Sequence, residues 1–260
     1  MQNILGEILK CEESYSRCFC EVADVGEVVR YKDEELKDMY DHNFIVVKDS
    51  VDESKMQEIA TMETEKASKA HADFMKMKVS SLPKKELVSW NGKKAEAEIS
   101  GIYLCHEEVL ENWVTRSDCK VSQITTEEQV EELVQLDLIH DEERCGRDFC
   151  YRRARRRGKV YRSSEYACNS YICYLEGKPV GNCDLFMDGQ VAKIEDFAVI
   201  PEYQRKGIGT TLLLAMVRKA QELGAKVIYL MADEDDTPKE MYIKLGFEKL
   251  GELYCLFFEL

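Results

Sequence analysis

The chain has 260 residues and 45% hydrophobic content, which is enough to bury the core of one large domain or of two domains of ordinary size. Its 50 Asp and Glu residues outnumber 36 Lys and Arg residues, and the net charge of −14 argues against a general binder of polyanions. The longest apolar runs fall far short of the about 20 residues that a membrane span needs, so the sequence predicts a soluble protein.

The cysteines and histidines form no site that the sequence makes visible. Eleven cysteines are an odd number in a large chain, and no secretory leader pattern opens the sequence. No Cys-x-x-Cys pair recurs, and the four histidines are scattered. We therefore expect reduced thiols, a cytoplasmic location and no metal site.

The first 115 residues carry a faint α/β pattern. Apolar segments near Val28 and over 44–47 precede a long helical candidate over 51–78, and 99–105 is a candidate strand. No glycine-rich turn follows that last strand. A degenerate repeat of the second half and an unrelated accessory domain both stay open, and we predict a first domain over residues 1–118.

The second half has a clearer order of elements. A strand over 121–124 leads to a helix that begins at Thr126, and two strands flank the turn at Glu176-Gly177. A strand over 191–200, a helix over 207–224 and a strand over 225–231 follow, an order typical of parallel strands joined by a crossover helix. Residues 119–260 are predicted to form one domain with a mixed α/β sheet.

The segment 201–210, PEYQRKGIGT, joins this strand to this helix. The first N–H groups of a helix have no intrahelical partner and favour anions, and glycine lets a phosphate approach the backbone closely. A Walker loop would need a Lys-Ser/Thr pair after the second glycine, and a dinucleotide fingerprint would need a third glycine. Neither pattern fits, although the segment predicts a ligand that carries phosphates.

Three motifs in order point to one family. Gln204-Arg205-Lys206-Gly207-Ile208-Gly209 matches the Q/R-x-x-G-x-G/A signature of the GCN5-related N-acetyltransferase (GNAT) superfamily. It is preceded by IEDFAVIP at 194–201 and followed by MYIKLGF at 241–247, which resembles the late Y-x-K-x-G-F block of that family. The second half, residues 121–260, therefore resembles a GNAT domain, and the first half is a candidate degenerate GNAT-like repeat.

The resemblance implies a donor, acetyl-CoA, and a set of residues that hold it. In the family, the loop amides bind the pyrophosphate, and the preceding strand splays from its neighbour at a bulge so that the pantetheine arm runs beside it. Carried over to this sequence, the expected cofactor-binding residues are Phe197, Ala198, Val199, Gln204, Arg205, Lys206, Gly207, Ile208, Gly209 and Thr210.

Acetyl transfer to an amine needs a base for the amine and an acid for the departing thiolate. Glu195 matches the position at which many relatives place a base, and Tyr242 resembles the tyrosine that protonates the thiolate. Strand alternation predicts that Glu195 and Asp196 point to opposite faces, so that only one of them faces the thioester. The predicted function is an acetyl-CoA-dependent N-acetyltransferase that transfers the acetyl group directly to a primary amine in a ternary complex. The acceptor is a small-molecule or protein amine, and the chain is a monomer or a dimer.

Two rival interpretations remain. In the first, the chain is a non-catalytic module that binds or senses acyl-CoA, and Glu195 and Tyr242 take part in no acetyl transfer. The segment 144–162 holds eight Arg and one Lys against the single acid Asp148, which is also compatible with a nucleic-acid-binding patch. The acidic surroundings of that segment make nucleic acid the less favoured partner.

Overall fold

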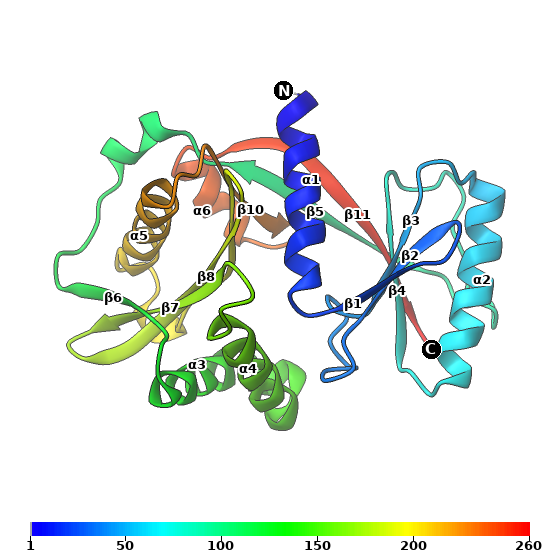
Figure 1. The fold of residues 1–260 in the computed structure, drawn as a ribbon, viewed down its shortest axis with the longest axis horizontal. Helices are drawn as coiled ribbons and strands as arrows, with labels where there is room; N and C mark the ends of the chain where they lie inside the picture. The colour runs from blue at the N-terminus through cyan, green and yellow to red at the C-terminus, as the bar shows by residue number, and fades with distance from the viewer. Residues whose placement is uncertain (1) are drawn as a thin grey trace. The chain divides into compact units, whose positions relative to one another are not determined.

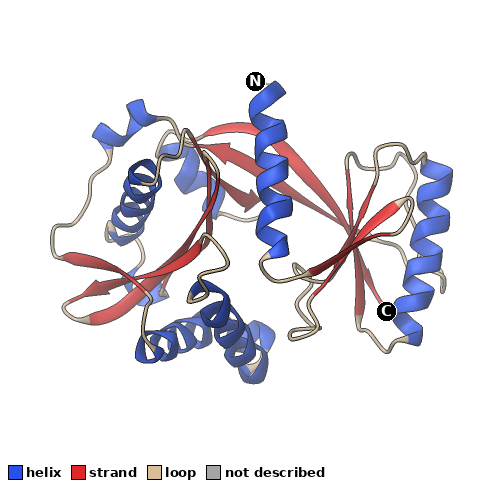
Figure 2. Cartoon of the chain, in the orientation of Figure 1, coloured by secondary structure: helices blue, strands red, loops and turns tan. Residues whose placement is uncertain are grey.

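The computed structural model describes residues 2–260, in which helices and strands alternate along most of the chain (Figures 1 and 2). The chain divides into two units, and each is discontinuous in sequence. Unit 1 comprises the described residues up to Cys18, Tyr103–Met231 and Pro238–Leu250; unit 2 comprises Phe19–Ile102, Ala232–Thr237 and Gly251–Leu260. The predicted domains, residues 1–118 and 119–260, were drawn from sequence motifs and not from contacts within the structure. That division stays a prediction.

Unit 1 contains most of the helices. Its elements are α1 (Gln2–Arg17), η1 (Glu107–Asn112), β6 (Cys119–Gln123), α3 (Glu127–Cys145), α4 (Arg147–Tyr161), β7 (Cys168–Leu175), β8 (Lys178–Asp188), β9 (Val191–Val199), η2 (Pro201–Tyr203), α5 (Ile208–Glu222) and α6 (Pro238–Lys244). Three strands, β5 (Glu96–Leu104), β10 (Val227–Asp233) and β11 (Glu248–Glu259), have residues in both units.

The sheet of unit 1 is mixed, as the sequence predicts. Strands β6, β7, β8 and β9 pair antiparallel in that order, and β9 pairs parallel with β10. The predicted turn at Glu176-Gly177 joins β7 to β8, and both residues have positive φ, which suits a tight hairpin. Figure 1 shows α5 on one side of the β6–β8 strands and α3 and α4 on the other.

The start of α3 confirms a local sequence signal. The Thr126 hydroxyl accepts a hydrogen bond from the backbone N–H of Gln129, and the Gln129 side chain accepts one from the backbone N–H of Thr126. This reciprocal capping box satisfies donors that the first turn leaves unpaired. The predicted helix start at Thr126 is therefore confirmed.

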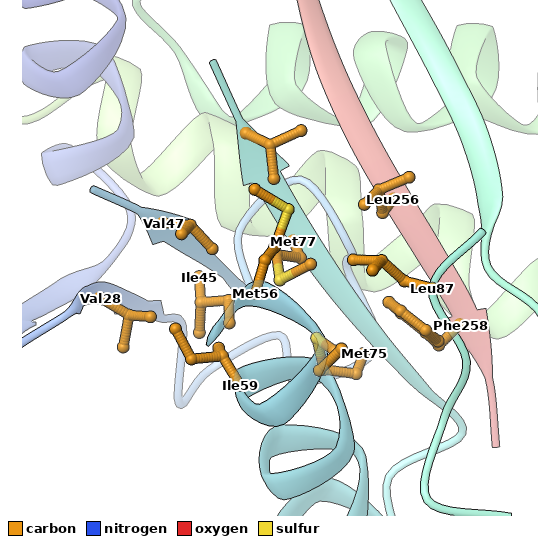
Figure 3. Close-up of a cluster of buried hydrophobic side chains, with 12 residues drawn as sticks. Val28, Ile45, Val47, Met56, Ile59, Met75, Met77, Leu87, Leu256 and Phe258 are labelled. Atoms are coloured by element: carbon orange, nitrogen blue, oxygen red, sulfur yellow. The ribbon is translucent and has the colours of Figure 1, made fainter. Parts of the chain in front are cut away.

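Unit 2 is built around one helix and a small sheet. Its elements are β1 (Glu21–Asp24), β2 (Val28–Lys32), β3 (Phe44–Val47), α2 (Glu53–Lys69) and β4 (Phe74–Val79). The pairs β1–β2, β2–β3 and β4–β11 are antiparallel, and β3–β4 is parallel, joined by α2. Side chains from α2 and the strands form a buried cluster that includes Met56, Met77 and Phe258 (Figure 3).

The predicted helix over 51–78 is wrong in its second part. Helix α2 ends at Lys69, and the chain turns at His71, whose φ of 57° is left-handed. The next residues form β4, in which Met75, Met77 and Val79 alternate into the core of unit 2. Because a non-glycine residue supplies the turn, no glycine marks the end of the helix in the sequence.

Candidate active site

The parallel pair β9–β10 separates partway along its length. Its register runs from Val191 opposite Val227 to Ile194 opposite Leu230. Beyond Ile194, over the part of β9 that the structure describes, the register continues only toward β8. The backbone edge of 195–199 that faces away from β8 therefore has no strand partner and offers hydrogen-bonding groups to a ligand.

A β-bulge occurs where this separation begins. Asp184 lies opposite Glu195 but Asn182 lies opposite Ala198, so one residue of β8 spans two residues of β9. Asp196 in the bulge has a φ of 49°, and its carbonyl accepts a 2.8 Å hydrogen bond from Asn182 Nδ2. A Cβ on Gly181 would lie 2.6 Å from the Ala198 carbonyl oxygen, so the bulge requires glycine in β8.

The bulge overturns the expectation that Glu195 and Asp196 point to opposite faces. One guanidinium, that of Arg157, lies 2.9 Å from Asp184 Oδ2 and 2.9 Å from Asp196 Oδ2. Asp184 is directly opposite Glu195 in the register, and paired residues of an antiparallel sheet share a face. The left-handed φ of Asp196 breaks the alternation, so both carboxylates lie toward the same side of the sheet.

The glycine loop gives α5 a start that no side chain caps. Arg205 and Gly207 have φ values of 60° and 80°, and Gly207 is the N-cap of α5 without a side-chain cap hydrogen bond. The first intrahelical hydrogen bond runs from Thr211 N to Gly207 O, so the N–H groups of 208–210 precede it. These donors and the helix dipole suit an anion such as a pyrophosphate.

Several contacts brace this loop. Gln204 Nε2 donates to Val199 O at 2.9 Å, and Lys206 Nζ donates to Glu202 O at 2.8 Å. A Cβ on Gly209 would lie 3.1 Å from the ring of Phe197 and 3.1 Å from Met241 Cε. The loop thus approaches the separated part of β9 closely, and Gly209 permits this approach because it has no Cβ.

The structure brings Tyr242 to the same strand. Tyr242 lies on α6, is 5% exposed, and its ring centroid is 6.3 Å from that of Phe197 and 5.7 Å from that of Phe247. Two of the three sequence motifs therefore meet at Phe197: the strand that contains it and the α6 tyrosine. The third motif, the glycine loop, reaches the same ring through Gly209.

Glu195 contacts a buried lysine. Lys193 Nζ lies 2.8 Å from Glu195 Oε2 and 2.9 Å from Glu12 Oε2 of α1. Burial raises the pKa of Glu195, the neighbouring Asp196 charge adds to the rise, and Lys193 opposes it. With 32% of its side chain exposed, Glu195 still reaches solvent. The sequence does not single out Glu12, because it is one of several acidic residues in its helix and lies 181 residues from Lys193.

The arginine-rich segment forms α4 and is neutralised within unit 1. Arg153 contacts Asp137 and Asp141, and Arg155 contacts Glu127 and Glu131. These partners lie on α3, whereas Arg157 reaches the sheet. The arginines of α4 therefore act first as internal ion-pair partners. These ion pairs explain the run of arginines more simply than a nucleic-acid-binding patch does.

Other possible sites lie elsewhere or are not seen. A cavity of about 500 Å³ opens in unit 2, and two of the cations that line it, Arg30 and Lys66, pair with the buried Glu63. Within residues 2–260, no group of three or more His, Cys, Asp or Glu side chains is arranged to hold a metal ion. All eleven cysteines are free thiols. None of the helices described is both long enough and apolar enough to cross a membrane.

Comparisons with known proteins agree with this geometry. Across 262 aligned residues, 97% of each chain, the protein is 24% identical to the uncharacterized N-acetyltransferase CgeE of Bacillus subtilis (strain 168). The structure of a GCN5-related N-acetyltransferase from Kribbella flavida superposes with a TM-score of 0.69 at 12% identity, over 96% of this chain and 93% of that one. A tandem GNAT protein from the clavulanic acid biosynthesis pathway superposes with a TM-score of 0.57 at 12% identity, over 99% and 95%.

The structural likenesses extend over both halves of the chain, which confirms the predicted fold class with a GNAT-like first half. The match to the family model is confined to the second half, where residues 129–247 match the model of the Acetyltransferase (GNAT) family. This range contains the bulged strand, the glycine loop and Tyr242. The predicted resemblance of the second half to a GNAT domain is thereby confirmed over residues 129–247.

Proposed function

We propose that the protein is an acetyl-CoA-dependent N-acetyltransferase that acetylates a primary amine by direct transfer within a ternary complex. The observation that carries the proposal is the separation of β9 from β10 at Ile194, directly before the uncapped start of α5. A strand edge without a strand partner and a helix N-terminus then follow one another in sequence, as a ligand with an extended arm joined to a pyrophosphate requires.

The donor would lie along this path. In the proposal, the backbone of Phe197, Ala198 and Val199 binds the pantetheine arm. The pyrophosphate is held by the segment from Gln204 to Thr210, with the N–H groups of 208–210 as the main donors and Arg205 as a cation. When bound, acetyl-CoA supplies an acyl group activated as a thioester. Backbone N–H groups at Ala198 or Val199 polarise the carbonyl that is attacked.

The acceptor amine must lose a proton, and Glu195 is the proposed base. Burial raises the pKa of Glu195, which makes its carboxylate a better proton acceptor than an exposed glutamate. Tyr242 is the proposed acid that gives a proton to the departing thiolate. The carboxylates of Glu195 and Asp196 favour a cationic acceptor, whether a small molecule or a protein amine. The free thiols suit a reducing cytoplasm.

The test follows thiol release from acetyl-CoA over a panel of primary amines. Glu195→Gln and Tyr242→Phe each remove one proton-transfer group, and such groups contribute about 10²- to 10⁴-fold to rate. We expect kcat to fall by about 10²-fold or more in each variant. Glu222→Gln and Tyr166→Phe, at exposed positions, are matched controls that should leave kcat unchanged.

The possible outcomes separate the alternatives. Tight binding of CoA without turnover for any amine would favour an acyl-CoA-binding module over an enzyme. Turnover that survives both substitutions would remove Glu195 and Tyr242 from the mechanism while leaving the enzyme class in place.

A further inference from the structure

A chain of charged groups links α1 to Glu195. Tyr229 OH donates a 2.6 Å hydrogen bond to Glu12 Oε1, and Lys193 Nζ donates a 2.9 Å hydrogen bond to Glu12 Oε2. The same ammonium lies 2.8 Å from Glu195 Oε2. Tyr15, one turn after Glu12 on α1, places its ring centroid 4.3 Å from Lys193 Nζ. All of these residues belong to unit 1.

Burial makes this arrangement sensitive to the charge on each member. The side chains of Lys193 and Glu12 are 4% and 11% exposed. A buried ammonium requires anionic partners, and here two carboxylates share it. If one carboxylate is lost, the ammonium is left to pair with the other alone.

Groups from every neighbouring element face this cluster. Those that titrate or carry charge are Cys11, Glu12 and Tyr15 from α1, Asp196 from β9, Cys183, Asp184 and Asp188 from β8, Cys168 from β7, Tyr229 from β10, and Arg157 and Tyr161 from α4. Burial raises the pKa of the thiols and phenols among them, so they stay neutral near pH 7. Arg157 is taken up by Asp184 and Asp196. Lys193 is therefore the cation in direct contact with Glu195, and Glu12 is its second carboxylate.

We propose that Glu12 of α1 is a positioning residue for acetyl transfer: it shares the Lys193 ammonium, so that Lys193 orients the Glu195 carboxylate without pairing with it exclusively. This inference rests on the proposed role of Glu195 as base. Glu12 and Glu195 compete for the Lys193 ammonium, since both carboxylates contact it. Helix α1 lies at the far end of the sequence from the glycine loop, and the sequence motifs of the second half do not include it.

The competition predicts opposite changes for two substitutions. In Glu12→Gln, Lys193 is left to Glu195 alone and a negative charge is lost nearby, so the pKa of Glu195 falls. In Lys193→Met, Glu195 loses a contacting cation, so its pKa rises further. Glu13→Gln, at the exposed neighbouring position of α1, is the matched control and should change nothing.

Two measurements on the full chain test this. The first is the acid limb of the pH profile of kcat/KM, which should move to lower pH in Glu12→Gln and to higher pH in Lys193→Met. The second is a side-chain carboxyl ¹³C titration, in which the Glu195 resonance is identified by its loss in Glu195→Gln. The titration needs no turnover, so it decides the inference even if the wild-type chain acetylates no amine and the proposed function fails.

The results that would overturn the inference are specific. Equal Glu195 titrations in Glu12→Gln and Glu13→Gln would show that Glu12 does not act on Glu195. Shifts of the same sign in Glu12→Gln and Lys193→Met would show that the two substitutions act through a general loss of structure. If Lys193→Met does not fold, the comparison of Glu12→Gln with Glu13→Gln alone decides.

Discussion

Gly207 allows a sharp test of the proposal that the glycine loop binds the donor. Its φ of 80° lies in the left-handed region, where an L-residue costs about 1–2 kcal/mol. A Cβ at this position would come no closer than 3.6 Å to Arg116 Cγ, which is ordinary contact. Gly207→Ala should therefore lower the free energy of unfolding by about 1–2 kcal/mol through backbone strain and not through a steric clash.

The same strain should appear in donor binding. If the alanine of Gly207→Ala relaxes away from the left-handed conformation, the N–H groups of 208–210 no longer converge, and binding must restore the strained loop. A cost of about 1.4 kcal/mol corresponds to a tenfold weaker dissociation constant. Isothermal titration calorimetry with CoA should therefore give a Kd about tenfold higher than that of the wild type.

The matched control is Gly224→Ala at the other end of α5. Gly224 has a φ of 90°, and a Cβ added there would have no atom beyond its chain neighbours within 4 Å, so its substitution carries the same kind of strain away from the loop. Urea unfolding should show similar losses of stability in both variants, with Kd raised only in Gly207→Ala. Equal Kd values in the two variants would refute the assignment of the pyrophosphate to this loop.

Three further predictions follow from other contacts. The Asp52 carboxylate accepts a 2.8 Å hydrogen bond from Lys55 N and so occupies the start of α2. Calorimetry should therefore find one CoA bound per chain. Two CoA molecules bound per chain would show that unit 2 also binds the donor. Arg157→Met leaves buried carboxylates without their cation and should cost about 3–5 kcal/mol of unfolding free energy. By contrast, Arg155→Met, with a 35% exposed side chain on the same helix, should cost less than about 1 kcal/mol, and equal losses would contradict this reasoning. Burial raises the pKa of Asp184 to about 7, so the native state gains a proton relative to the unfolded chain between about pH 4 and 7, and stability should fall as pH rises through that range. Asp184→Asn should flatten that fall in urea unfolding at several pH values; an unchanged slope would show that another group titrates.

The sequence predicted those parts of the fold that local chemistry determines. The periodicity of α5, the hairpin at Glu176-Gly177 and the cap at Thr126 are each set by residues close together in the chain, and each is confirmed. Helix α2 was predicted too long because His71 adopts a conformation that glycine usually signals. The GNAT motifs also led to Phe197 and Tyr242, which the structure brings together.

The contacts of Glu195 could not be predicted in the same way. The bulge at Asp196 depends on Asn182 and Gly181 in the facing strand, and strand alternation alone predicts the wrong face. Glu12 reaches Lys193 only through the packing of α1, and no spacing rule connects residues 181 positions apart. Sequence motifs thus located the proposed donor-binding loop, whereas the electrostatic surroundings of the proposed base came from tertiary structure.

The discontinuity of unit 1 has a consequence for synthesis on the ribosome. Helix α1 emerges before all of unit 2, yet its partner Lys193 lies 181 residues later. At about 5–20 residues per second, the apolar face of α1 lacks its strand for on the order of 10–40 seconds. During that interval unit 2, apart from its final segments, is already made. Helix α1 must therefore stay exposed, or bound to a chaperone, until β9 has been translated.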